Sequence, residues 1–302
     1  MKNDTFFSDF SSEFEPKFQK EIKNLYENSF DTSFDPSLLT TFLDPVIPYV
    51  QTGKRIRPFL IAVGADKLDT KVIDAGIAFE LLHTFILIHD DIMDGATMRR
   101  DVPTVHEVFN TQGIPGYAAA MLVGDFLFAA CNEYMSKNVS ELMPLFSKMQ
   151  RFICVGQFYE LVHWGQKIEP EVSKNIARFK SAQYSFMYPL QYGLQLAGKD
   201  IHMLDVYADA AGLGFQLRDD WLDLTGEMSG KDKGLDQKNS VPNLVQNALL
   251  SHNGDQDATK QEIQGLLTNH RQKGNHELEN IDLSPQQKNS LSTLLTFSTS
   301  IS

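Results

Sequence analysis

Cysteine is nearly absent from this chain. Only Cys131 and Cys154 occur among 302 residues, which is too few for a disulfide framework. Both lie in apolar stretches, so we expect them to be small core residues. The first residues are polar and acidic, and they lack the charged-then-apolar pattern of an export signal. These features predict a cytoplasmic protein.

Positive charge is also in short supply. Lysine and arginine number 27 against 39 aspartates and glutamates, so the formal net charge is −12. A surface of that sign repels nucleic acid and anionic membranes, and we expect neither as a partner. The longest apolar run, residues 117–131, is interrupted by Asp125 and is too short to span a bilayer. We therefore expect no stable membrane insertion.

Strand patterns and nucleotide-binding loops are scarce as well. Few runs of β-branched residues alternate, and there is no P-loop or dinucleotide fingerprint. Apolar residues instead recur at helical spacing in 71–92, 116–134, 142–162, 172–196 and 201–224. Several of these segments are apolar on nearly all sides, as in buried helices. With no repeat or linker in view, we predict one all-α domain over residues 1–302, with 1–15 open to disorder: a single large bundle of about ten or more helices.

Two segments end an apolar helix with a cluster of acids. Residues 89–94 read HDDIMD, and residues 218–223 read RDDWLD. The acids are Asp90, Asp91 and Asp94 in the first cluster and Asp219, Asp220 and Asp223 in the second. Acids four residues apart share a helix face, where like charges destabilise the helix by a few tenths of a kcal/mol. A single such cluster could be a solvated helix end, but two favour a bound cation, and oxygen-only ligands suit Mg²⁺.

The few cations gather in short segments that complement these acids. Lys54, Arg55 and Arg57 fall within four residues, and Arg99 and Arg100 follow the first acidic cluster. Further lysines stand at Lys180, Lys231, Lys233 and Lys238. Arginine binds phosphate oxygens in pairs, and lysine acts as a point charge. Lys54, Arg55 and Arg57 alone could be a solvated surface patch. In an acidic protein that also has two acidic clusters suited to Mg²⁺, they predict a diphosphate site.

Taken together, these segments resemble the trans-prenyl diphosphate synthases, the polyprenyl synthetase family. The motifs are GKRIRP at 53–58, LLHTFILIHDDIMDGATMRRDVPT at 81–104, GDFLF at 124–128, GQFYEL at 156–161, FKSAQYS at 179–185 and GFQLRDDWLDLTGEMSGKDKG at 214–234. The resemblance runs from about Thr52 to the C-terminus. It implies an isoprenoid synthase-like bundle around a central cavity, a homodimer, and a short-chain enzyme of the geranylgeranyl or farnesyl diphosphate synthase type. Such an enzyme condenses isopentenyl diphosphate with an allylic diphosphate.

The resemblance also assigns roles to the matching residues. Asp90, Asp94 and Asp219 would bind Mg²⁺, about three ions in all with diphosphate present, and Asp91, Asp220 and Asp223 would support them. Lys54, Arg57, His83 and Arg100 would form the isopentenyl diphosphate site. Arg99, Lys180, Ser181, Gln216 and Lys231 would hold the allylic diphosphate. Phe85 and Ile86, about one turn before Asp90, would form the floor that limits product length, and they favour a C20 over a C15 product.

Several positions depart from the family pattern. Asp101 replaces the glycine that usually follows the arginine pair, and Ser181 replaces a threonine but keeps the hydroxyl. Glu160 replaces the aspartate of the GQxxD element. The stretch after Asp236 is shortened, so Lys238 does not match a phosphate-binding lysine cleanly.

Two other functions stay open. A class I terpene cyclase also carries a DDxxD motif, but it needs neither a second one nor GKRxRP, and its N-D-x-x-S-x-x-x-E pattern is absent. A non-catalytic subunit of another synthase is disfavoured by the intact aspartates, while the altered 236–242 stretch keeps it open. In the preferred mechanism, metal and cationic side chains neutralise the departing diphosphate. The double bond of isopentenyl diphosphate attacks the allylic cation, and a proton is then lost, which the family resemblance assigns to the departed diphosphate.

Overall fold

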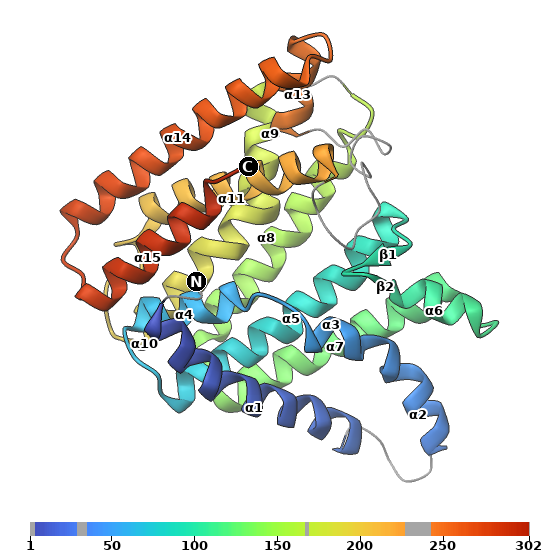
Figure 1. The fold of residues 1–302 in the computed structure, drawn as a ribbon. Coiled ribbons are helices and arrows are strands. Elements are labelled where there is room, and N and C mark those ends of the chain that lie inside the picture. Colours follow the sequence, from blue (N-terminus) through green and yellow to red (C-terminus); the bar gives the residue numbers. More distant parts are fainter. Residues whose placement is uncertain (1–3, 29–34, 167–168, 227–242, 302) are drawn as a thin grey trace.

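The computed structural model of the protein describes residues 4–28, 35–166, 169–226 and 243–301 (Figure 1). Its helices are α1 (Thr5–Asn28), α2 (Pro36–Leu43), η1 (Asp44–Val46), α3 (Ile47–Gln51), α4 (Ile56–Ala65), α5 (Thr70–Asp94), α6 (Val105–Thr111), α7 (Gly116–Asn138), η2 (Ser140–Leu142), α8 (Met143–Leu161), α9 (Pro170–Ala177), η3 (Arg178–Met187), α10 (Tyr188–Leu196), α11 (Asp205–Thr225), α13 (Leu244–Ser251), α14 (Gln256–Asn280) and α15 (Pro285–Ser298). Two short strands, β1 (Met98–Arg99) and β2 (Val102–Pro103), pair in an antiparallel hairpin. The predicted all-α class is confirmed.

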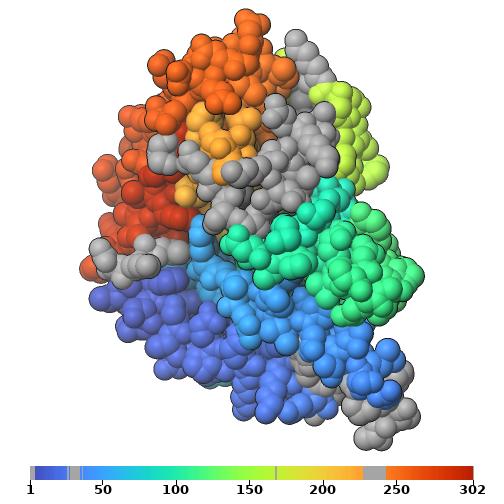
Figure 2. All heavy atoms as spheres, turned by 45° about the vertical axis from the view of Figure 1, so that its right-hand side comes forward, coloured from blue at the N-terminus to red at the C-terminus, as the bar shows by residue number. Residues whose placement is uncertain are grey.

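The bundle is organised around α5, which packs against α7 on one side and α4 on the other. Helix α4 packs on α10, and α11 packs on η3 and α14. Buried apolar side chains form one large cluster that includes residues of α1, α3 to α8, η3, α10, α11, α14 and α15. A smaller cluster lies among α11, α13 and α14. In the view of Figure 2, α1 lies at the lower end of the molecule and α14 at the upper end.

The ends of α5 and α11 are set by their capping residues. The side chain of Asp69 accepts a hydrogen bond from the backbone N–H of Val72 at 3.0 Å, which starts α5. Gly95 ends α5 with φ 64°, and Gly226 ends α11 with φ 68°. Glycine adopts this left-handed conformation without the penalty of a Cβ. Each acidic cluster therefore lies in the last turns of its helix.

The expectation of disorder in residues 1–15 is wrong for the part that the structure describes. Phe6, Phe10, Phe14 and Phe18 recur every four residues along α1, and all are buried. The rings of Phe10, Phe14 and Phe18 stack in turn, with centroids 5.1 Å apart for Phe10 and Phe14 and 5.4 Å apart for Phe14 and Phe18. The polar residues between them gave the segment its hydrophilic composition. The helical period of the phenylalanines was the better indicator, because a helix needs only one apolar face to dock.

The two cysteines differ in environment. Cys131 is buried in the core, as expected, whereas Cys154 is exposed on α8, so the core expectation is wrong for Cys154. Its neighbour Val155 and the nearby Phe158 are exposed as well. The apolar stretch of α8 thus covers an outer face as well as an inner one.

Helix α5 is the one described helix that is long and apolar enough to cross a membrane. However, 72% of its most apolar window is buried inside the fold. That degree of burial is typical of a central core helix, whose apolar surface is covered by protein.

Candidate active site

A cavity of about 760 Å³ is lined by the start of α4, by α5, α8, α9 and η3, and by α11. Its wall contains most of the residues predicted from the sequence: Lys54, Arg57, His83, Ile86, Asp90, Asp94, Arg99, Arg100, Lys180, Ser181, Gln216, Asp219, Asp220 and Asp223. Phe85 and Asp91 are not part of that wall. Lys231 and Lys238 lie outside the residues that the structure describes. The two acidic clusters therefore face one shared space.

The acidic clusters occupy unfavourable positions within their own helices. Asp90 and Asp94 lie near the C-terminus of α5, and Asp219 and Asp223 lie near that of α11. The partial negative charge of a helix C-terminus disfavours carboxylates there, in addition to their mutual repulsion. Nearby cations offset part of this cost. Asp90 contacts Arg99 at 3.4 Å and Lys180 at 3.5 Å.

No group of three or more His, Cys, Asp or Glu side chains able to hold a metal occurs among the described residues. Mg²⁺ usually takes only one or two carboxylates, and it completes its shell with water and substrate phosphate. Carboxylates facing each other across a cavity lined by arginine and lysine are a donor set of that kind. The residues present therefore fit an ion that is shared with a bound diphosphate.

Asp91 has a different environment from its two neighbours in the motif. It is 1% exposed, and its carboxylate accepts hydrogen bonds from the hydroxyl of Tyr49 and the Nε of Arg99, both at 2.6 Å. Burial alone would lower the pKa of Arg99, but the adjacent carboxylates of Asp91 and Asp90 raise it. Asp91 thus supports the site by fixing Arg99 at the cavity wall as a permanent cation.

Residues 178–187 form a π-helix, η3, between α9 and α10. Its wider turns place Lys180, Ser181 and Tyr184 together at the cavity. Gly156 of α8 permits this approach, because a Cβ at that position would lie 2.9 Å from the backbone nitrogen of Lys180. π-helical turns are rare and frequently occur at functional sites.

Lys180 is held between two acids. Its Nζ lies 2.7 Å from the carboxylate of Glu160 and 3.5 Å from that of Asp90. Burial would lower the pKa of Lys180, but Asp90, Glu160 and Asp94 together raise it well above its usual value. Lys180 is therefore a fixed positive charge. The substitution of Glu160 for the family's aspartate keeps an acid that reaches this lysine.

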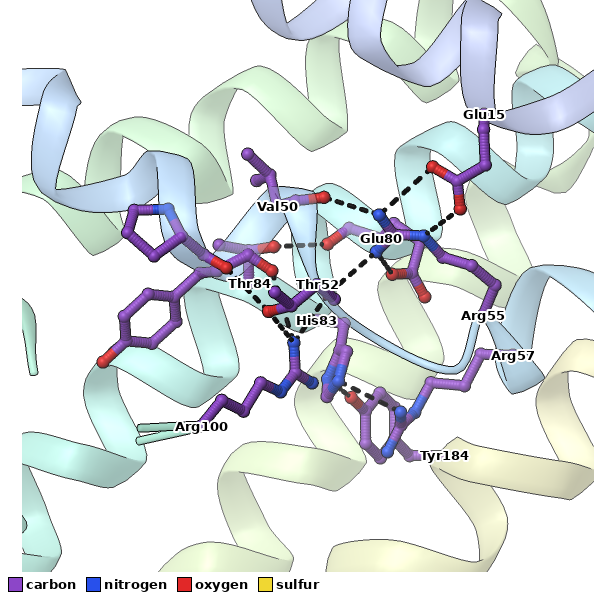
Figure 3. Close-up of polar contacts among 12 residues, drawn as sticks. Glu15, Val50, Thr52, Arg55, Arg57, Glu80, His83, Thr84, Arg100 and Tyr184 are labelled. Carbon is purple, nitrogen blue, oxygen red and sulfur yellow. Dashed lines mark hydrogen bonds and ion pairs between the residues drawn. The ribbon is translucent and has the colours of Figure 1, made fainter. Parts of the chain in front are cut away.

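The GKRIRP segment is held in place by an ion network that the sequence did not reveal (Figure 3). Arg55, at φ 51°, donates to Glu80 of α5 and to Glu15 of α1, both at 2.8 Å. The side chains of Arg55 and Glu80 are each 5% exposed. A buried charge must be paired. The single acid in the apolar run FELLH, Glu80, was therefore the one sign in the sequence that a buried cation partner exists. This network fixes the loop that presents Lys54 and Arg57.

His83 lies between Arg57 and Tyr184 (Figure 3). Nε2 of His83 is 3.1 Å from an Arg57 nitrogen, and Nδ1 is hydrogen-bonded to the hydroxyl of Tyr184. Burial, followed by the charge of Arg57, holds the pKa of His83 well below its usual value, so the ring is neutral. Arginine can only donate. Nε2 must therefore accept, and the ring proton sits on Nδ1, facing Tyr184.

Arg100 extends the basic side of the cavity. It donates to the carbonyl of Thr52 at 2.7 Å and to the hydroxyl of Thr52 at 3.1 Å. Burial, and then the charge of Arg99, lower its pKa. Arginines and a lysine gathered this closely repel one another, so an anion entering the cavity would relieve the repulsion. The site thus has a basic part beside α4 and an acidic part at the ends of α5 and α11.

Residues 40–281 match the family model for polyprenyl synthetase. This chain belongs to the polyprenyl synthetase family. It is 34% identical over 198 residues to the geranylgeranyl diphosphate synthase of Methanosarcina mazei, covering 61% of this chain and 59% of that protein. It is 33% identical over 220 residues to the farnesyl diphosphate synthase of Geobacillus stearothermophilus, covering 66% and 71%. The chain therefore spans less than two thirds of the Methanosarcina protein's length.

Solved structures share the fold of this polyprenyl synthetase. The geranylgeranyl pyrophosphate synthase of Corynebacterium glutamicum, solved with isoprenyl diphosphate and magnesium, superposes with a TM-score of 0.82 at 21% identity, covering 98% of both chains. The geranyltransferase of Helicobacter pylori gives a TM-score of 0.71 at 26% identity, covering 94% of this chain and 96% of that one. The predicted isoprenoid synthase-like fold is confirmed.

One departure of this polyprenyl synthetase from its family pattern has a measurable consequence for stability. Arg100 and Asp101, with φ 53° and 66°, form the turn between β1 and β2. Two-residue hairpin turns of this kind favour glycine at the second position. Asp101→Gly should therefore raise the free energy of unfolding by about 0.5–1 kcal/mol, measured by urea denaturation. Asp101→Ala is the control and should lower it. Equal stability of both variants would contradict the account.

Proposed function

We propose that this chain is a trans-prenyl diphosphate synthase that condenses isopentenyl diphosphate with an allylic diphosphate. The observation that carries the proposal is the single cavity faced by both acidic clusters and by the basic GKRIRP segment. A reaction between two diphosphates needs two anion sites that open on one space. The names of the relatives support a short-chain product, and we propose C20 ahead of C15.

The basic part of the cavity is the proposed site for isopentenyl diphosphate. Lys54, Arg57 and Arg100 supply the charge, and neutral His83 accepts the Arg57 hydrogen bond that orients the guanidinium. Lysine and arginine recognise diphosphate without an intervening metal. The substrate with the unactivated double bond would therefore be held only by positioned cations.

The acidic part is the proposed site for the allylic diphosphate. Asp90, Asp94 and Asp219 would hold Mg²⁺, about three ions in all with Asp220 and Asp223 beside them, and the metal would supply neutralising charge to the leaving diphosphate. Arg99 and Lys180 lie on the same wall as fixed cations, with Ser181 and Gln216. Positive charge preset where negative charge develops is an effective way to lower the barrier.

An assay with purified protein tests the proposed function. Isopentenyl diphosphate is supplied with dimethylallyl, geranyl, farnesyl or geranylgeranyl diphosphate, with Mg²⁺ or with EDTA. We expect Mg²⁺-dependent chain extension. Hydrocarbon or alcohol products from an allylic diphosphate alone would indicate a terpene cyclase instead. No product with any primer, from protein that binds the substrates, would indicate a non-catalytic subunit.

Product length is proposed to depend on Phe85 and Ile86. Ile86 lines the cavity, whereas Phe85 packs between α5 and α7. The ring centroid of Phe85 lies 5.0 Å from that of Phe128 and 4.6 Å from that of His89. If the growing prenyl chain extends between α5 and α7, the ring of Phe85 would block it and so limit the length of the product.

Phe85→Ala should lengthen the product by at least one isoprene unit, because it removes a ring that fills the space between α5 and α7. Products are dephosphorylated and separated by reversed-phase chromatography. Phe126→Ala is the matched control and should leave product length unchanged, since its ring packs on Phe42 of α2 with centroids 5.8 Å apart. An identical product spectrum from Phe85→Ala and wild type would place the floor elsewhere.

We also propose that the chain is a homodimer and works in the cytoplasm. Most of its large exposed apolar side chains lie on α7 and at α8: Tyr117, Met121, Leu122, Phe152, Val155, Phe158 and Val162. Apolar surface gathered on adjacent helices is typical of an interface. Both cysteines are free, which fits the reducing cytoplasm. Light scattering after gel filtration should give twice the monomer mass of 34.1 kDa. A monomer at micromolar concentration would contradict the dimer.

A further inference from the structure

Phe297, near the end of α15, contacts two cations of the cavity wall. Nζ of Lys54 lies over its ring at 4.8 Å from the centroid, and the guanidinium carbon of Arg218 lies at 4.7 Å. Lys54 and Arg218 both line the cavity, while Phe297 is partly buried behind them against the core. Phe297 also lies beyond residue 281, where the family match ends. None of the sequence motifs of the site includes it.

The last described residues also fix Arg218 directly. Its Nε donates to the backbone carbonyl of Ser300 at 2.9 Å, and another nitrogen lies 3.4 Å from the carboxylate of Asp219. Arg271 of α14 in turn holds the carbonyl of Thr299 and the hydroxyl of Ser300, both at 2.8 Å. Arg218 is therefore held by a ring, a carbonyl and a carboxylate at once. The C-terminal segment after α15 is part of this support.

Lys54 lacks comparable anchoring by the rest of the loop. It is exposed, whereas Arg57 and Arg100 are half-buried. Its ammonium group nevertheless lies at the cavity wall, where partial desolvation, followed by the charges of Arg218 and Arg100, lowers its pKa, while Asp219 acts in the opposite direction. A lysine on a flexible stem loses rotamer freedom when it binds a ligand. The negative face of an aromatic ring attracts an ammonium group and limits its motion beforehand.

We propose that Phe297 is a positioning residue that holds Lys54 and Arg218 at the cavity wall, so that an incoming diphosphate meets cations already in place. The inference rests on the proposed function, because it assigns this role at the isopentenyl diphosphate site. It extends the site to α15. Lys54 and Arg218 carry like charges and repel each other. The ring of Phe297 attracts both of them although it carries no net negative charge. A carboxylate in its place would compete with the substrate.

The competing account of Phe297 is plain packing. Its ring lies 6.3 Å from that of Phe215, which lines the cavity. An aliphatic side chain would preserve packing but not the attraction for cations, which comes from the ring quadrupole. Leucine and tyrosine at this position therefore separate the two roles. Phe186 provides a matched control, because its ring contacts the same Phe215 at 5.6 Å.

The test is calorimetric titration of inorganic pyrophosphate in EDTA, which follows binding by the basic residues without metal or turnover. Phe297→Leu should weaken binding about tenfold, and Phe297→Tyr should stay within about twofold of wild type. Phe186→Leu should also stay within about twofold. In a Lys54→Ala background, Phe297→Leu should lose most of its effect, as expected for residues that act through one another.

Kinetics supply the second readout. Phe297→Leu should raise KM for isopentenyl diphosphate about tenfold, with kcat and KM for the allylic primer within about twofold. Equal pyrophosphate affinities of the leucine and tyrosine variants would overturn the inference, as would absence of pyrophosphate binding by the wild type. If the wild type bound pyrophosphate but catalysed no prenyl transfer, the proposed function would fail while the titrations still decided the role of Phe297.

Discussion

Asp90→Ala should slow prenyl transfer at least about a hundredfold, because a metal contact contributes several kcal/mol and about 1.4 kcal/mol corresponds to one decade of rate. Asp90 of α5 contacts cations from two other elements of the site, η3 and β1. Its carboxylate lies at the cavity wall within 3.5 Å of Lys180 and 3.4 Å of Arg99. The variant would lose a proposed Mg²⁺ ligand. Of the two acids that contact Lys180, only Glu160 would remain.

The same substitution should not destabilise the fold. Asp90 stands one turn from Asp94 at the negative end of α5, so its removal relieves a repulsion of a few tenths of a kcal/mol. It also gives up contacts with Arg99 and Lys180, but those cations keep closer partners in Asp91 and Glu160. We therefore expect a urea unfolding midpoint close to that of the wild type, together with the loss of turnover. Glu133→Ala is the matched control, since that acid is 61% exposed on α7 and should keep wild-type kinetics. Near-normal activity of Asp90→Ala would remove the assigned role.

The two acidic motifs could be placed from sequence because their geometry is local. Residues i and i+4 share a helix face whatever the helix packs against. The same rule separates neighbours. Asp91 is about 100° around the helix from Asp90, and the structure accordingly buries it against Tyr49 and Arg99. Ile86 and Phe85 differ in the same way, one lining the cavity and the other packing toward α7. Periodicity applied residue by residue would have distinguished both pairs.

Other parts of the site depend on contacts between distant segments. Glu15 and Glu80 lie 40 and 25 residues from Arg55, and no local pattern pairs them. Phe297 and Lys54 meet only because α15 returns to the start of α4. The π-helix at Lys180 likewise requires α8 to approach at Gly156. The charges of the site were therefore predictable, whereas the residues that hold those charges in position required the fold.

Arg55→Ala should destabilise the fold more than any substitution in the two acidic clusters. It removes one member of a buried ion pair and leaves Glu80 charged and unpaired, which costs about 3–5 kcal/mol. Lys137→Ala is the control, because it breaks an exposed pair with Glu133 and should cost less than about 1 kcal/mol. Both free energies of unfolding are measured in urea.

The double variant Arg55→Met with Glu80→Met separates stability from function. Replacing both charges by apolar side chains of similar size should recover most of the lost stability. It should not recover affinity for isopentenyl diphosphate, because the loop bearing Lys54 is held by Arg55 through Glu15, Val50 and Glu80. A stable double variant with wild-type KM for that substrate would show that the network serves folding alone. A stable variant with raised KM would establish that the buried pair sets the position of the cations that bind diphosphate.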